Sequence, residues 1–258
     1  MPSAELAGQV ALVTGGGRGI GANVARELAA AGMDVTVTGR TAEQVESVAA
    51  EIGGRGLVGD VSRQDDVARW AGETGDVDLL VCNAGVGGLP EPFSAHTPEQ
   101  WWRTFEVNVL GVYVCCRAFA PRMVERGGGR IVNVASGAGY QPARPGQATA
   151  YAASKAAVHR FSEVLAAELA PQDVFVFSIS PGLVRTAMTE GHMPDDAPWT
   201  PPECAPRLVR ALAGGELDAL AGRYLHAEHD SPDELRRRIG EIQEHDLNAV
   251  RLRREVFD

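Results

Sequence analysis

The chain has 258 residues, a net charge of −10, 45% apolar residues and 22% charged residues. This composition is ordinary for a globular protein and excludes general disorder, while the acidic balance argues against a protein that binds duplex nucleic acid. The sequence predicts no membrane-spanning helix, and residues 1–5 lack the charged and apolar regions that begin a signal peptide.

Short β-branched segments alternate with alanine-rich helical segments along most of the chain. The expected strands are 9–14, 34–38, 56–58, 77–82, 130–135 and 174–180. The expected helices are 19–31, 42–52, one from about 64, one from a capping box at 97–100 to about 124, and 150–169. This alternation predicts parallel crossovers, and therefore an α/β fold with a doubly wound parallel sheet and helices on both faces.

No linker or internal repeat divides the chain, so we expect one domain, residues 1–230, with an extra C-terminal helix in 231–258. Residues 187–206 are rich in Pro, Met and Asp and are expected to form an adaptable loop over the substrate. The tail begins with a second capping-box pattern at 231–234 and continues as a strongly charged helix. The four cysteines form no C-x-x-C pair, so we expect buried free thiols in a reducing cytoplasm.

A glycine-rich loop, residues 14–21, lies between the first strand and the first helix. Glycines let a backbone turn tightly and approach a pyrophosphate, and a helix N-terminus offers free N–H groups to phosphates. Although the strict G-x-G-x-x-G spacing is absent, the position of the cluster favours a nucleotide site over a plain flexible turn.

The end of the second strand indicates which dinucleotide binds. An NAD site places a carboxylate there, but this strand ends in Gly39-Arg40-Thr41, and Asp34 lies at its opposite end. Arg40 can hold a ribose 2′-phosphate, and Arg18 in the glycine loop is a second candidate. The pair favours NADP(H) over NAD(H), although either arginine could be an ordinary surface charge.

The basic residues include 23 arginines and only one lysine, Lys155. Lys155 follows Tyr151 by four residues, which places both on one helix face. An ammonium near a phenol lowers the pKa of the phenol, so Tyr151 is a candidate acid or base near pH 7. Ser136 follows a strand at the edge where such sheets bind ligands, so its hydroxyl could contact a substrate carbonyl.

Taken together, these motifs resemble the short-chain dehydrogenase/reductase family over roughly residues 6–226. The resemblance rests on motifs that occur in the family's order: Thr14-Gly15-x-x-x-Gly19-x-Gly21, Asp60-Val61, Asn83-Ala84-Gly85, Asn108, Ser136, Tyr151-x-x-x-Lys155 and Pro181-Gly182-x-Val184-x-Thr186. The end of the chain departs from the family, because Val-Asp-Gly-Gly is replaced by residues 226–230 and a further helix.

The resemblance implies a role for each matching residue. Tyr151 would donate or accept the proton, Lys155 would lower its pKa and bind the nicotinamide ribose, Ser136 would orient the substrate oxygen, and Asn108 would hold a water linked to Lys155. The cofactor would also contact Gly15, Gly17, Arg18, Gly19, Ile20, Gly21, Arg40, Thr41, Asp60, Val61, Asn83, Ala84, Gly85, Pro181, Gly182, Val184 and Thr186. Ser136, Tyr151, Leu183 and Met188 would contact the substrate.

The main hypothesis is an NADP(H)-preferring oxidoreductase that interconverts a ketone and a secondary alcohol without a metal. A non-catalytic NADP(H) sensor of the same fold and an epimerase that uses nicotinamide transiently are the alternatives. The resemblance implies a homo-oligomer, dimer or tetramer, with the helices at 99–124 and 150–169 as its dimer face. We expect no nucleic-acid or membrane partner.

Overall fold

The protein is described by a computed structural model that covers residues 6–89, 91–143, 146–190 and 193–251. Its centre is one seven-stranded sheet in the order β3-β2-β1-β4-β5-β6-β7, in which every pairing is parallel. The strands are β1 (Val10–Thr14), β2 (Asp34–Gly39), β3 (Arg55–Val58), β4 (Leu79–Cys82), β5 (Gly129–Val134), β6 (Val174–Ser180) and β7 (Tyr224–His226). The expected doubly wound α/β fold is confirmed.

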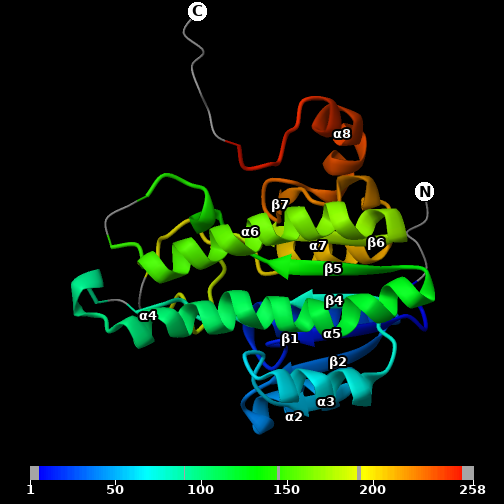
Figure 1. The fold of residues 1–258 in the computed structure, drawn as a ribbon, viewed down its shortest axis with the longest axis horizontal. Coiled ribbons are helices and arrows are strands. Elements are labelled where there is room, and N and C mark those ends of the chain that lie inside the picture. The colour runs from blue at the N-terminus through cyan, green and yellow to red at the C-terminus, as the bar shows by residue number, and fades with distance from the viewer. Residues whose placement is uncertain (1–5, 90, 144–145, 191–192, 252–258) are drawn as a thin grey trace, which may run out of the picture.

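Helices cover both faces of the sheet (Figure 1). The helices are α1 (Gly19–Ala30), α2 (Ala42–Ile52), α3 (Gln64–Thr74), α4 (Pro98–Phe105), α5 (Gly111–Arg126), α6 (Thr149–Leu169), α7 (Cys204–Ala213) and α8 (Pro232–Glu244). Side chains of α1, α2, α7 and α8 share one buried apolar cluster with the sheet, and those of α3, α5 and α6 share the other. The core is therefore two layers, one on each side of the sheet.

The strand order reverses between β1 and β4. The crossovers from β1 lead toward β3 on one side, whereas β4 and the later strands extend the sheet on the other. In open parallel sheets, the loops on either side of this reversal diverge and leave a crevice at the carboxyl ends of the strands. The glycine loop after β1 and residues 83–85 after β4 meet at this point, which positions the site.

One expected helix is interrupted. The sequence predicts a continuous helix to about residue 124, but a π-helical turn, Glu106–Leu110, separates α4 from α5. By length and mean hydropathy (1.2), the run Pro98–Arg126 could cross a membrane, yet 56% of its most apolar stretch is buried in the fold, as in a core helix. The capping box expected at its start is present between Thr97 and Gln100.

The C-terminal part of the chain differs from expectation at two places. The loop predicted to reach residue 206 ends earlier, because α7 begins at Cys204 and buries Leu208 and Leu212 against the sheet. The tail helix α8 begins after Ser231, whose Oγ accepts a hydrogen bond from the Glu234 backbone (3.3 Å), and ends at Glu244. Two of its side chains, Leu235 and Ile242, lie in the core, so α8 is part of the packed fold.

Candidate active site

The crevice at the strand reversal holds a cavity of about 390 Å³. Its lining comes from the glycine loop, the ends of β2, β3, β4 and β5, helix α6 and the segment after β6. Most of the residues predicted to bind the cofactor lie on its wall: Gly15, Gly17, Arg18, Gly19, Ile20, Arg40, Thr41, Asp60, Val61, Asn83, Ala84, Gly85, Tyr151, Lys155, Pro181 and Thr186. Residues separated by more than 170 positions in sequence therefore meet in one site.

Two glycines of the loop, Gly15 and Gly21, lie too close to neighbouring atoms to carry a side chain. Gly15 has a φ of +64°, and a Cβ there would lie 2.9 Å from the Ala84 Cα. At Gly21 a Cβ would lie 2.4 Å from the Gly15 carbonyl oxygen, so this residue allows α1 to start directly beneath the loop. Gly21 does not line the cavity itself. The loop thus leaves open the space in front of the α1 N-terminus, which suits a diphosphate.

Two polar side chains join the glycine loop to the end of β4. The Thr14 hydroxyl accepts hydrogen bonds from the backbone N–H groups of Asn83 (3.0 Å) and Ala84 (3.1 Å). Asn83 Nδ2 in turn donates to the carbonyl oxygens of Thr14 (3.0 Å) and Gly15 (3.2 Å). Asn83, expected to line the floor of the site, therefore also fixes the loop that would hold the phosphates.

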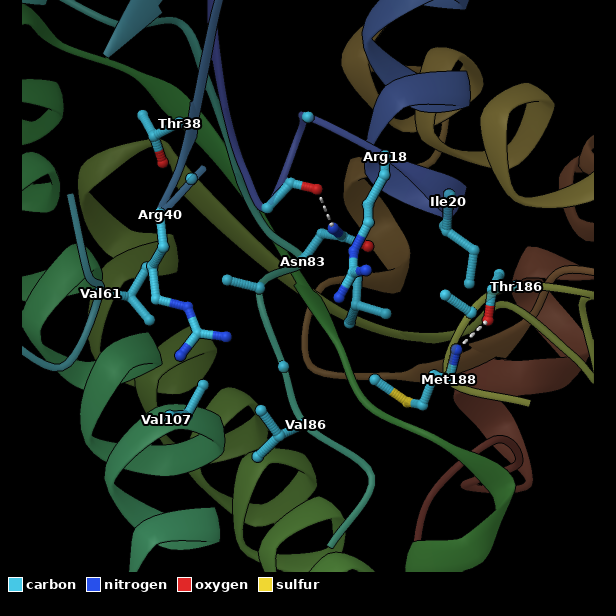
Figure 2. A pocket seen from close by; sticks show the side chains of 18 of the residues that line it. Arg18, Ile20, Thr38, Arg40, Val61, Asn83, Val86, Val107, Thr186 and Met188 are labelled. Atoms are coloured by element: carbon cyan, nitrogen blue, oxygen red, sulfur yellow. Dashed lines mark hydrogen bonds between the residues drawn. The ribbon is translucent and has the colours of Figure 1, made fainter. Parts of the chain in front are cut away.

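Arg18 and Arg40 extend into the cavity from different elements (Figure 2). Arg18 precedes α1, Arg40 follows β2, and both side chains are exposed. Among the described residues, neither guanidinium forms a hydrogen bond or ion pair, whereas most other arginines do. Asp60 is the one carboxylate among the described residues that line the cavity.

Asp60 is held by Arg103, a residue that no sequence motif marks. Arg103 of α4 donates from Nη2 to Asp60 Oδ2 (2.8 Å) and from Nη1 to Ser62 Oγ (3.0 Å). Ser62 donates to Asp60 Oδ1 through its hydroxyl (2.7 Å) and backbone (2.9 Å). Burial raises the pKa of Asp60, but the bonds from Ser62 and Arg103 outweigh it, so the carboxylate stays ionised.

Tyr151 and Ser136 are brought together at the inner end of the site. Ser136 lies just beyond β5 and outside the lining of the cavity, and its Oγ accepts from the Ala138 backbone (3.2 Å). Burial raises the pKa of Tyr151 above its ordinary value, and the nearby Ser136 hydroxyl only partly offsets this. Desolvation therefore dominates the pKa of Tyr151 in the protein alone, and the expected lowering of this pKa by Lys155 stays a prediction.

Lys155 is buried on the same face of α6. Its Nζ donates to the Val134 carbonyl oxygen (2.8 Å), and it lies 5.7 Å from the centre of the Tyr151 ring. No carboxylate in the described part of the chain pairs with it, and burial lowers its pKa to about 8. A Cβ on Gly85 would lie 3.6 Å from Nζ, so the ammonium reaches the floor of the cavity next to that glycine.

Asn108 lies behind the site rather than on its wall. Its Oδ1 accepts from the Val86 backbone N–H (2.9 Å), and its Nδ2 donates to the Val86 carbonyl (3.0 Å) and to Ser154 Oγ (3.0 Å). These bonds tie the segment after β4 to α6 at the π-helical turn. The side chain is thus engaged in positioning, and the water-holding role that the resemblance implies would fall to the backbone of this turn.

The segment after β6 forms the end of the cavity at which the family resemblance would place the nicotinamide. Pro181, Thr186 and Met188 lie on the wall, and the Met188 backbone donates to Thr186 Oγ1 (3.3 Å; Figure 2). Three other predicted contacts, Gly182, Leu183 and Val184, lie outside the lining. Residues 191–192, within the loop expected to lie over the substrate, lie outside the described residues.

Several lining residues were not anticipated from the sequence. They are Thr38, Gly39, Gln44, Val45, Gly59, Val86, Val107, Val134, Ala135 and Ala187. Most are neighbours of predicted residues, so the strand ends themselves were the available signal. Gln44 and Val107 come from α2 and the π-helical turn, and no local pattern marks them.

This geometry defines a class: an α/β protein whose crevice suits a dinucleotide, with the buried Lys155 and the half-buried Tyr151 on its wall and the half-buried Ser136 beside them. Comparison with known proteins agrees. The sequence profile described as short chain dehydrogenase matches residues 9–197. The chain is 40% identical over 203 residues to a D-threitol dehydrogenase of Mycolicibacterium smegmatis, covering 75% of this chain and 76% of that one.

Two further comparisons point the same way. A 3-oxoacyl-[acyl-carrier-protein] reductase of Synechocystis is 38% identical over 195 residues, covering 72% of this chain and 78% of the reductase. The Pseudomonas aeruginosa RhlG/NADP active-site complex superposes with a TM-score of 0.81 at 30% identity, covering 89% of this chain and 98% of that chain. The chain therefore belongs to the short-chain dehydrogenase/reductase family and is an oxidoreductase of that family.

Proposed function

We propose that the protein is an NADP(H)-preferring oxidoreductase that interconverts a ketone and a secondary alcohol. The observation that carries this proposal is that Tyr151, with Ser136 beside it, and Lys155 lie at a cavity whose wall also bears two arginines, Arg18 and Arg40, that have no partner among the described residues; Tyr151 and Lys155 line this cavity and Ser136 does not. When bound, the nicotinamide would supply or accept the hydride. The chain itself would supply the proton and hold the reacting carbon in place.

The residues present fit such a cofactor. The glycine loop leaves a cradle in front of the α1 N-terminus that a Cβ at Gly15 would disrupt, and N–H groups of the first helical turn face it without a side-chain cap. Lys155 would hold the nicotinamide ribose, because its ammonium lies at the cavity floor and lacks a carboxylate partner. Arg18 and Arg40 would hold the 2′-phosphate as charge-assisted donors.

The pKa shifts support a different role for Tyr151 than for Lys155. Because burial raises the pKa of Tyr151, its hydroxyl keeps the proton at neutral pH and suits donation to a carbonyl oxygen. Ser136, beside the Tyr151 hydroxyl, would orient that oxygen. Lys155, with a pKa of about 8, remains mostly protonated at pH 7 and can stabilise the phenolate that proton donation leaves.

Tyr151→Phe tests this proposal, because it removes the proton donor and leaves the ring in place. We expect the rate of NADPH oxidation with a responsive ketone to fall about 10²–10⁴-fold, while NADPH affinity, followed by cofactor fluorescence, stays within about twofold. Tyr113→Phe, at an exposed position on α5, is the matched control and should keep the wild-type rate. A normal rate in Tyr151→Phe would remove the assigned proton role.

We also propose that the enzyme forms a homo-oligomer in the cytoplasm and acts on a small carbonyl or alcohol substrate. Large apolar side chains are exposed on α4, α5, α6 and the turn between α4 and α5: Trp102, Leu110, Tyr113 and Val164. All four cysteines are free, which fits a reducing compartment. Names of the relatives support polyols and β-ketoacyl groups as first substrates to test.

A further inference from the structure

The turn after β7 gathers side chains for which the proposed reaction has no use. It lies within residues 222–230, the part of the chain that departs from the Val-Asp-Gly-Gly ending common in the family. One ligand atom from each of His226, Glu228 and His229 lies within 4.8 Å of the other two. The two imidazole rings are stacked, with centroids 4.3 Å apart and planes 13° from parallel. Two imidazoles and a carboxylate are thus presented at one point.

The backbone of this turn is held in place by its own hydrogen bonds. The Asp230 carboxylate accepts from the His226 backbone N–H (2.7 Å) and from Asn248 Nδ2 (3.1 Å). The backbone N–H groups of His229 (3.1 Å) and Asp230 (2.8 Å) donate to the His226 carbonyl. Ala227 donates to the Ser180 carbonyl at the end of β6 (2.9 Å). The backbone of the cluster is therefore fixed to the sheet, so a cation could bind with little further ordering of the chain.

The carboxylate of the cluster already has a supporting partner. Glu228 Oε2 accepts from the Thr200 hydroxyl (2.5 Å), and Thr200 is buried with 3% of its surface exposed. The Thr200 hydroxyl also accepts from the Leu183 backbone (2.9 Å), in the segment that closes the cofactor cavity. Glu228 itself is exposed, so its second oxygen can be reached by a cation. Such outer partners orient metal ligands in known sites.

We propose that His226, Glu228 and His229 bind one divalent first-row transition-metal ion, for which Zn²⁺ is the probe. Two histidines, one carboxylate and a water form a common four-coordinate Zn²⁺ set. Ligand atoms around such an ion lie about 3.5 Å apart. Side-chain rotations that move the present ligand atoms by about an ångström would bring them to this spacing. Binding through His226 Nδ1 would replace the long hydrogen bond from the Glu228 backbone (3.3 Å).

The site lies at the carboxyl edge of the sheet but outside the cofactor cavity. The hydrogen bonds from the Leu183 backbone to Thr200 and from Thr200 to Glu228 connect the cluster to the segment after β6, at the end of the cavity proposed for the nicotinamide. A bound ion would hold Glu228, and through it Thr200, in the arrangement seen here. The ion would therefore stabilise the conformation of the segment after β6 and would not take part in hydride transfer.

Direct metal binding tests the proposal. The full chain without an affinity tag is stripped with a chelator, and Zn²⁺ binding is measured by calorimetry, with Co²⁺ absorption in the visible range as the geometric readout. We expect one Zn²⁺ per chain and a four-coordinate Co²⁺ spectrum. His229→Ala and Glu228→Gln should each weaken Zn²⁺ binding at least tenfold, whereas His245→Ala, an exposed histidine outside the cluster, should not.

The variants remain interpretable because Glu228 and His229 are exposed. Their midpoints of thermal unfolding without metal should match the wild type, and only the wild type and His245→Ala should gain stability with Zn²⁺. The proposal fails if Zn²⁺ does not bind, if His229→Ala binds it as tightly as the wild type, or if Mg²⁺ competes equally, since that would indicate a site of oxygen ligands.

Discussion

At the scale of the residue, Lys155 shows a conflict between stability and function. Its ammonium is buried, its only hydrogen bond in the described structure goes to the Val134 carbonyl, and its pKa is lowered to about 8. A charge in such a place destabilises the folded protein. It is the residue that the proposed reaction needs, because only a slim ammonium reaches both the cavity floor and the neighbourhood of Tyr151.

Lys155→Met should therefore stabilise the protein while it abolishes turnover. A fall in pKa from 10.5 to about 8 corresponds to about 3 kcal/mol, and about 1 kcal/mol is returned when the Val134 carbonyl loses its donor. We expect the free energy of unfolding at pH 7, measured with urea, to rise by about 2 kcal/mol.

The pH dependence of that gain follows from linkage. Between pH 8 and 10.5 the unfolded chain keeps the lysine proton and the native protein does not, so wild-type stability rises with pH in this window. The gain of Lys155→Met over the wild type should accordingly shrink there. Lys155→Arg, which keeps the charge, should show neither the added stability nor the activity.

Arg40 offers a second test at this scale. Its guanidinium faces the cavity without a partner among the described residues, so a 2′-phosphate would provide its main interaction. Arg40→Ala should raise the Kd for NADPH about 10–100-fold, the value of a charge-assisted hydrogen bond of 1.5–3 kcal/mol, and leave the Kd for NADH within about twofold. Arg117→Ala, exposed on α5, is the control. Equal losses for both cofactors would contradict NADP(H) preference.

At the scale of the element, the sequence predicted what depends on local pattern and missed what depends on distant contacts. Strand 174–180 and helix 42–52 were placed correctly, because β-branched runs and helical periodicity mark them. The π-helical turn was not, because it accompanies the bonds between Asn108 and the Val86 backbone, 22 residues away. The start of α7 at Cys204 was hidden by the prolines around it.

Helix α6 carries a third residue on the face of Tyr151 and Lys155. His159 Nδ1 is hydrogen-bonded to Ser178 Oγ of β6 (3.2 Å), its ring lies 4.2 Å from that of Tyr224, and 7% of its surface is exposed. Burial lowers the pKa of His159 to about 4. The native protein therefore keeps this imidazole neutral, whereas the unfolded chain protonates it below about pH 6.5.

Acid should destabilise the protein through this helix. As the pH falls from 6.5 toward 4, the unfolded state gains a proton that the native state does not, so stability declines. In His159→Gln the loss of unfolding free energy between pH 7 and 4.5 should be smaller by roughly 2 kcal/mol. His245→Gln, at an exposed position, should leave the pH dependence unchanged; the same slope in His159→Gln and wild type would refute the assignment.

At the scale of the whole molecule, topology brings the site together. The glycine loop belongs to the β1–α1 unit, whereas Ser136 and the Tyr151–Lys155 pair belong to the β5–α6 unit, and the sequence identified them because each lies at a strand end or a helix start. It gave no sign of Arg103, which reaches from α4 to Asp60 on the cavity wall. Such a bond depends on where α4 is placed over β3, and that placement is a property of the complete fold.

The C-terminal helix α8 also packs into the common core of the fold. Ile242 of α8 is 1% exposed and packs in the same apolar cluster as α1 and α7. Ile242→Ala should lower the free energy of unfolding by about 2–5 kcal/mol through the lost contacts and the cavity. Val250→Ala, half exposed in the same tail, should change it by less than about 0.5 kcal/mol. A small effect at Ile242 would mean that α8 is only loosely attached.

The scarcity of lysine has a practical consequence for chemical labelling. Lys155 is the only ε-amino group in the sequence, and it lies in the cofactor cavity with a lowered pKa, which makes its amine a nucleophile near neutral pH. An acylating reagent added to this protein finds no other lysine to consume it. Modification of a single side chain would then report whether the cavity is open, and a dinucleotide that fills the cavity would protect it.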